Sequence, residues 1–300
     1  METHPPCRVK FWGVRGSVPT PGPSTVYYGG NTSCIEVRAD GELIILDAGT
    51  GIRLLGLALA KEFGERPIAA TLLITHTHWD HIQGFPFFQP AYDAKNRLRI
   101  LGYEGAKIGL GTTLAGQMES PYFPIALQEM PSNIVIEELK GMHFSIGRVR
   151  VEAWIMNHPG IAVGYRLFTS AGSVAYLPDN EPFSHEQVEA PAHVTDTNNQ
   201  RLLEFIRNAD VLVADAQYER AEYSAHVGWG HGCADDVVRL AMSANVKQLF
   251  LFHHDPAHDD QRISAMVGRA RAIVRDEGGS LLVEAAREGC EVALNQSSSA

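Results

Sequence analysis

The 300-residue sequence contains few cysteines and no long apolar run. Its four cysteines (Cys7, Cys34, Cys233 and Cys290) form no C-x-x-C pair, which argues against a disulfide scaffold or a structural zinc knuckle and fits a reducing compartment. No stretch approaches the roughly 18 apolar residues of a membrane span, and the N-terminus has no apolar signal core. We therefore expect a cytoplasmic protein with no membrane partner.

Positive charge is also scarce. The chain has 25 Lys and Arg against 35 Asp and Glu, a formal net charge of −10, with no basic arm or stripe. Because proteins that hold long nucleic acids present clustered Lys and Arg to the phosphates, we expect no long nucleic-acid partner. Bound divalent cations would offset the negative charge locally, so a small-molecule phosphate ester remains compatible. The sequence is also compatible with a homodimer.

The remaining composition is that of an ordinary globular protein, with 45% hydrophobic and 20% charged residues. Both halves carry strands followed by helices, with no linker between them, which predicts a single α/β domain over residues 1–300 with loose ends at about 1–6 and 295–300. We expect helices at 53–63, 82–88, 199–208, 235–243 and 260–277, and strands at 8–12, 34–38, 43–46, 71–75, 97–102, 134–139, 142–146, 149–155, 162–168, 174–177, 211–214, 248–252 and 281–285.

The densest polar cluster follows the apolar run at residues 71–75. Three histidines and an aspartate occur within six positions, at a strand's carboxyl end, where open α/β sheets collect their ligands: His76, His78, Asp80 and His81. Imidazole and carboxylate are the ligands that zinc and similar ions take. One ion cannot easily take all four groups from so short a stretch, so two adjacent ions are the natural interpretation. The alternative, a polar loop with scattered surface histidines, is disfavoured by the H-x-H-x-D-H spacing.

Three further strand ends repeat this arrangement. His158 follows the strand at 149–155, Asp179 follows 174–177, and His253 follows 248–252. Each of these residues taken alone is more typical of a surface group than of a ligand. Three repeats of a strand followed by His or Asp indicate further ligands of the same metal site.

The order H-x-H-x-D-H, His, Asp, His resembles the metallo-β-lactamase superfamily over nearly the whole chain. The resemblance implies an αββα four-layer sandwich with the metals at one edge of two facing sheets. It implies that His76, His78 and His158 hold one ion, that Asp80, His81 and His253 hold the other, and that Asp179 bridges them. The ions would be zinc or manganese, with iron also open, and a water or hydroxide between them would be the nucleophile. His254 is an alternative last ligand, but the family's last histidine directly follows its strand.

Within the superfamily, the chain is more similar to the tRNA 3′-processing endonucleases and related phosphodiesterases. The turn at 31–33 resembles their Asn-Thr-Ser turn, and Asp215 with His231 resembles their acid-then-histidine pair. That resemblance implies that His231 is a general acid or phosphate clamp and Asp215 its partner, and it adds Asp80 to the catalytic groups. A carboxylate would fix the imidazole tautomer and raise its pKa. The chain departs from the endonucleases by carrying Asp215 and Cys233 where they carry Glu and Thr, and by lacking their basic arm.

Substrate-binding residues are less marked in the sequence. Asn31 and His254 lie beside motif residues, and Tyr122 and Phe123 are adjacent aromatics between prolines. The segment 118–124 suits a lid over a ligand, and it suits equally a loop plugged into the core. The loop at 228–232 also has the position of a substrate-selecting segment.

The first functional hypothesis is a binuclear phosphodiesterase acting on a small diester such as a cyclic nucleotide. The second is a lactone, thioester or β-lactam hydrolase on the same scaffold, since metals and fold do not fix the substrate. The third is a redox di-iron protein or a catalytically silent sensor. Redox members of the superfamily carry a glutamate where His78 stands, and the complete hydrolytic set argues against a silent relic.

Overall fold

The computed structural model describes residues 7–103, 109–182 and 192–294, without the side chains of 192–197. The two predicted loose ends lie outside the described residues. Among the described helices, none combines the length and apolar composition needed to cross a bilayer.

The first half of the chain builds a seven-stranded sheet in the order β14-β1-β2-β3-β4-β5-β6. Its strands are β1 (Arg8–Gly13), β2 (Cys34–Ala39), β3 (Glu42–Leu46), β4 (Ala69–Ile74), β5 (Arg97–Gly102), β6 (Asn133–Glu138) and, from the C-terminal end, β14 (Glu291–Ala293). Its helices are α1 (Ile52–Phe63), α2 (Trp79–Ile82) and α3 (Leu110–Gly116). Asp40 and Gly41 both have positive φ in the β2–β3 hairpin, as a two-residue Asp-Gly turn requires.

The second half builds another seven-stranded sheet in the order β13-β12-β11-β10-β9-β8-β7. Its strands are β7 (His143–Ile146), β8 (Val149–Ile155), β9 (Val163–Thr169), β10 (Gly172–Leu177), β11 (Val211–Asp215), β12 (Gln248–Phe252) and β13 (Leu282–Ala285). Its helices are α4 (Ala192–Ile206), α5 (Arg220–Tyr223), α6 (Ala234–Ser243) and α7 (Asp260–Asp276).

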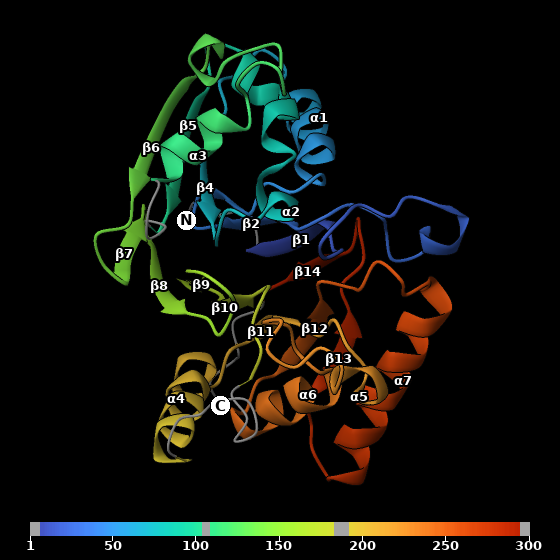
Figure 1. Ribbon diagram of the computed structural model, residues 1–300. Coiled ribbons are helices and arrows are strands. Elements are labelled where there is room, and N and C mark those ends of the chain that lie inside the picture. Colours follow the sequence, from blue (N-terminus) through green and yellow to red (C-terminus); the bar gives the residue numbers. More distant parts are fainter. Residues whose placement is uncertain (1–6, 104–108, 183–191, 295–300) are drawn as a thin grey trace.

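The two sheets face each other, and the helices cover their outer faces (Figure 1). Phe11, Tyr165 and Phe250 belong to the apolar core between the sheets. A second core packs α1 against the first sheet, and a third packs α4, α6 and α7 against the second. These three apolar layers separate four layers of secondary structure, so the predicted αββα sandwich is confirmed.

Strand direction explains why polar residues collect at one edge. β10, β11 and β12 are parallel neighbours, and β8 has the same direction because β9 is antiparallel to both β8 and β10. In the first sheet, β3 and β4 are also parallel. The carboxyl ends of parallel strands meet at one edge, so residues far apart in sequence arrive there together.

Local structure departs from the sequence prediction at several places. The helix expected at 82–88 begins at Trp79, inside the motif, and ends at Ile82; a short 3₁₀ helix (Phe85–Phe87) follows. Pro86 lacks the N–H that a continuing α-helix needs. Helices α3 and α5 and strand β14 had no prediction, and α4 starts at Ala192 rather than near 199. These elements are short or weakly amphipathic, so their sequence signal is small.

Candidate metal centre

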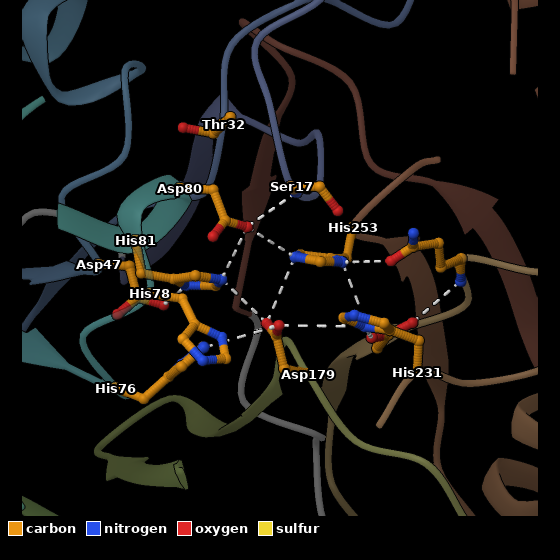
Figure 2. A network of polar contacts seen from close by, with 12 residues as sticks. Ser17, Thr32, Asp47, His76, His78, Asp80, His81, Asp179, His231 and His253 are labelled. Atoms are coloured by element: carbon orange, nitrogen blue, oxygen red, sulfur yellow. Dashed lines mark hydrogen bonds and ion pairs between the residues drawn. The ribbon is translucent and has the colours of Figure 1, made fainter. Parts of the chain in front are cut away.

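The carboxyl ends of five strands (β4, β8, β10, β11 and β12), the start of α2 and the loop before α6 bring the His and Asp residues of the motifs into one cluster (Figure 2). Among the described residues, three groups have metal-binding geometry, with one donor atom from each residue within 4.8 Å of every other. The first group is His76, His78 and His158, the second is Asp80, His81, Asp179 and His253, and the third, which overlaps the second, is Asp179, Asp215, His231 and His253. The first two groups therefore contain the residues predicted for the two ions, with Asp179 in the second group.

Asp179 lies between the two groups and turns one oxygen toward each. Its Oδ2 is 3.8 Å from Nε2 of His76 and 3.8 Å from Nε2 of His158. Its Oδ1 is 3.0 Å from Nε2 of His81 and 3.4 Å from Nε2 of His253. Figure 2 shows Asp179 with His76, His78 and His81 on one side and His253 and His231 on the other. A carboxylate in this position can share its two oxygens between two ions.

Several inward-facing atoms of the cluster have no hydrogen-bond partner. Nε2 of His76 is buried and has no hydrogen-bond partner. Nε2 of His81 and Oδ1 of Asp179 are also buried without a hydrogen bond, although they form an ion pair at 3.0 Å. Buried polar atoms are normally hydrogen-bonded, and a bound cation would satisfy a buried cluster of imidazole nitrogens and carboxylate oxygens. The residues present thus fit a divalent metal site of the N/O type.

The opposite ring nitrogens are held by the surrounding protein, which fixes how each imidazole faces the centre. Nδ1 of His158 donates to the carbonyl oxygen of Gly230 at 3.1 Å, and Nδ1 of His253 donates to Oε1 of Gln217 at 3.0 Å. Both bonds leave Nε2 free to face the cluster. Such outer contacts orient metal ligands and tune their affinity.

Asp47 makes several of these outer contacts, and the sequence did not predict it as a site residue. It is fully buried and accepts hydrogen bonds from Nδ1 of His81 (2.8 Å), from the backbone and hydroxyl of Thr75, and from the hydroxyl of Tyr176 (2.8 Å). The sequence carries a signal for it, because Asp47 directly follows an apolar strand, and Asp179 follows another apolar strand after one proline.

Charge and burial set the protonation of the cluster. Burial lowers the pKa of His76 well below its usual value, which keeps the ring neutral and able to bind a metal. Burial opposes ionisation of Asp80, but the nearby His81 and His253 outweigh it and hold the pKa of the carboxyl well below its usual range. Asp80 also accepts the backbone N–H of Ser17 at 2.8 Å, which ties the loop after β1 to the cluster.

His231 and Asp215 form a second functional unit next to the ligands. Nδ1 of His231 lies 2.7 Å from Oδ2 of Asp215, and the His231 ring stacks on His253 at 4.9 Å. The other carboxylate oxygen of Asp215 accepts the backbone N–H groups of Gln217 and Gly232. Burial lowers the pKa of His231, but Asp215 outweighs it and raises that pKa to about 9. The sequence had paired these two residues.

Asn31 and His254 lie in a neighbouring polar network rather than among the ligands. The Asn31 amide donates to Oε2 of Glu288 at 2.9 Å. His254 is buried, and its Nε2 donates to the carbonyl oxygen of Ala286 at 2.9 Å. Of the three groups with metal-binding geometry among the described residues, two contain His253 and none contains His254.

The 118–124 segment is anchored in the core of the first half. Met118 is buried there, and Phe123 packs against the same core and meets Phe87 edge to face at 5.5 Å. Tyr122 is 80% exposed. No contact described in the structure joins Tyr122 or Phe123 to the metal ligands.

Comparison with known proteins places this geometry in a family. The β-lactamase superfamily domain matches residues 43–254, which hold all seven proposed ligands. The chain belongs to that superfamily. It is a family of metal-dependent hydrolases, so the expectation of a hydrolase is confirmed.

Individual relatives extend the match over most of the chain. Ribonuclease Z of Thermoplasma acidophilum is 23% identical and covers 85% of this chain and 89% of its own. A metallo-β-lactamase-fold protein of Bacillus subtilis superposes with a TM-score of 0.66 at 16% identity, covering 96% of this chain and 99% of its own. The short form of human tRNase Z superposes with a TM-score of 0.63 at 17% identity, with the same coverage.

The comparisons correct one expectation. We predicted no long nucleic-acid partner from the net charge of −10 and from the missing basic arm. Relatives matched over most of the chain are ribonucleases Z, and a structural neighbour is a tRNase Z, so that exclusion is wrong. Net charge averages over the whole surface and says little about the potential inside one metal-containing cleft.

Proposed function

We propose that this protein is a two-metal phosphodiesterase. The observation that carries the proposal is the His231–Asp215 pair, 2.7 Å apart, with the His231 ring stacked on His253 beside the first two donor groups. A phosphodiester leaves an alkoxide that requires a proton, and so does a lactone, while a β-lactam leaves an amine that requires one. Relatives matched over most of the chain are ribonucleases Z, which favours a phosphodiester as the bond beside this pair.

The first donor group would hold one divalent ion and the second the other, with Asp179 shared between them. Two adjacent ions lower the pKa of a bound water and neutralise the oxygens of a phosphoryl group. Zinc fits this imidazole and carboxylate set, and manganese or iron would also find suitable ligands.

The protein's own groups would then handle the proton. Asp215 accepts Nδ1–H of His231, so the proton available to the substrate is the one on Nε2. The raised pKa of about 9 favours the protonated imidazolium at neutral pH. His231 would therefore donate from Nε2 to the leaving oxygen, and Asp215 would stabilise the imidazolium before the transfer.

Two classes of diester are candidates. A small diester such as a cyclic nucleotide is the first, since the hydrogen-bonded cluster itself needs only one phosphodiester group. The 3′ end of an RNA is the second, because the relatives include ribonucleases Z.

The test is a hydrolysis screen of zinc- and manganese-loaded protein on a 2′,3′-cyclic nucleotide, a precursor tRNA, a homoserine lactone and a cephalosporin. We expect turnover of a phosphodiester, and a kcat at least 100-fold lower for His231→Ala with unchanged metal content. Turnover of only the lactone or the cephalosporin would reject the phosphodiesterase, and full diesterase activity in His231→Ala would reject His231 as the proton donor.

A further inference from the structure

Two exposed tryptophans stand beside the candidate metal centre, one from each half of the molecule. Trp79 directly follows His78 and is 77% exposed. Trp229 is 58% exposed and directly precedes Gly230. The carbonyl oxygen of Gly230 accepts a hydrogen bond from His158. Nδ1 of His78 and Nε2 of His158 are 3.1 Å apart. In sequence, therefore, Trp79 is next to His78 and Trp229 is next to Gly230, and both of these neighbours contact His158.

This side of the centre is where it opens to solvent. His78 is the exposed member of its donor group, while His76 is buried. Both tryptophans are thus exposed and are sequence neighbours of residues that contact His158 on this side of the cluster. Neither tryptophan takes part in the proton transfer or the metal binding described above.

The Trp229 backbone is held in place although its ring is exposed. Both flanking glycines, Gly228 and Gly230, have φ of +85°, a conformation that favours glycine. Their N–H groups donate to the buried carboxylate of Glu181 at 2.9 to 3.0 Å. His226 packs edge-on against the indole at 4.9 Å. The loop therefore presents a fixed aromatic side chain.

The Trp79 backbone is fixed by the metal motif itself. Trp79 begins α2, and its carbonyl oxygen accepts the N–H of Gln83 at 2.7 Å. The next two residues, Asp80 and His81, both belong to the second donor group. An aromatic side chain on a rigid backbone loses little freedom when a ring stacks on it, so binding costs less entropy.

We propose that Trp79 and Trp229 bind a planar aromatic ring of the substrate, a nucleobase or an aryl ester group, next to the scissile phosphodiester. This inference rests on the proposed function and narrows its substrate class. Every nucleobase and aryl group has a π-face, and indole is a favourable surface for stacking because it is large and rigid. The two tryptophans would select substrates that carry an aromatic ring, whatever the nucleotide sequence.

Binding of product-like ligands tests the inference without turnover. Zinc-loaded protein is titrated calorimetrically with AMP, phenyl phosphate and ribose 5-phosphate. We expect AMP, phenyl phosphate or both to bind at least tenfold more tightly than ribose 5-phosphate, and the tighter of the two identifies the ring as nucleobase or aryl. Trp79→Ala and Trp229→Ala should each weaken the ring-bearing ligand about tenfold and leave ribose 5-phosphate within about twofold. Phenylalanine at either position should restore most of the preference.

A matched control is Leu282→Ala, which also removes an exposed apolar side chain. Leu282 is 63% exposed and pairs with Gln248, five residues before His253, at the opposite end of the strands. This variant should keep the ligand preference of the native chain. Equal binding of all three ligands by the native chain, or an unchanged preference in the double tryptophan variant, would overturn the inference. So would a change of oligomeric state in that variant without a change of preference, because the indoles would then belong to a protein interface.

Hydrolysis separates this inference from the proposed function. The ratio of kcat/KM for a nucleoside-bearing diester to that for glycerophosphodiester should fall about tenfold or more in the double variant. If diesters are hydrolysed and the ratio does not change, the ring site is wrong and the phosphodiesterase stands. If no diester is hydrolysed but the tryptophans still decide the binding preference, the ring site stands and the phosphodiesterase is wrong.

Discussion

Oδ2 of Asp47 lies 2.8 Å from Nδ1 of His81, and both side chains are completely buried. Because a carboxylate only accepts, the bond fixes the tautomer of His81 and leaves Nε2 facing Asp80 and Asp179. The same carboxylate accepts the hydroxyl of Tyr176 from the second sheet. One aspartate thus ties a metal ligand to both halves of the sandwich.

Replacing Asp47 by alanine should lower zinc affinity about 10- to 100-fold, because His81 loses the group that orients it. Competition with a chromogenic chelator measures the affinity. Tyr176→Phe removes one hydrogen bond to Asp47 and keeps the contact with His81, so its affinity should change less than threefold. Equal losses in the two variants would mean that the effect comes from general destabilisation.

Gly230→Ala should disturb His158 specifically. A Cβ at position 230 would lie 2.4 Å from Nδ1 of His158, whereas a Cβ at Gly228 meets nothing within 4 Å. Both glycines have φ of +85°, so alanine at either position carries a similar backbone strain of about 1 kcal/mol or more. Only Gly230→Ala should also lower zinc affinity, by at least about tenfold. Isothermal titration of both variants checks the difference, and identical affinities would contradict it.

Removing the metal should destabilise the fold. Bound ions would pair with buried donor atoms that make no hydrogen bond, among them Nε2 of His76 and Nε2 of His81. At a free metal concentration about 100 times Kd, each site adds about 2.7 kcal/mol, so a chelator should lower Tm by about 5 °C or more. Mass spectrometry should give two ions for each chain, and added zinc should restore Tm. One ion for each chain would contradict the two-ion arrangement.

The effect of His231→Asn should depend on the leaving group. An alkoxide needs a proton, so kcat on an alkyl diester should fall about 100- to 10,000-fold. p-Nitrophenolate leaves without a proton, so kcat on bis(p-nitrophenyl) phosphate should fall less than about tenfold. Steady-state kinetics on both substrates check this. A similar fall on both would assign His231 to holding the phosphate rather than to donating a proton.

Asp215→Asn should reproduce part of that effect. The amide keeps the shape of the side chain but removes the charge that raises the pKa of His231 to about 9. We expect a kcat on the alkyl diester between those of the native chain and His231→Asn, and an activity optimum at lower pH, because the imidazole then loses its proton at lower pH. An unchanged pH profile would contradict the pairing.

Residue order alone identified most of the candidate centre. His76, His78, Asp80 and His81 are close in sequence, and His158, Asp179 and His253 each follow an apolar strand. A strand and its first polar residue are local features, so the sequence can show them. The exception is Asp47, which has the same local pattern but whose contacts with His81, Thr75 and Tyr176 come from three other segments.

The sequence by itself predicted the fold class, the His and Asp residues of the candidate centre and the His231–Asp215 pair, because each is carried by local periodicity or by a motif with fixed spacing. The tertiary structure alone decided where long-range packing puts a side chain. It buried His254 against Ala286, turned Asn31 toward Glu288 and anchored Phe123 beside Phe87. It also brought His78 and Gly230, the sequence neighbours of Trp79 and Trp229, into contact with His158. Contacts of this kind depend on how two sheets close on each other, and no local pattern records that closure.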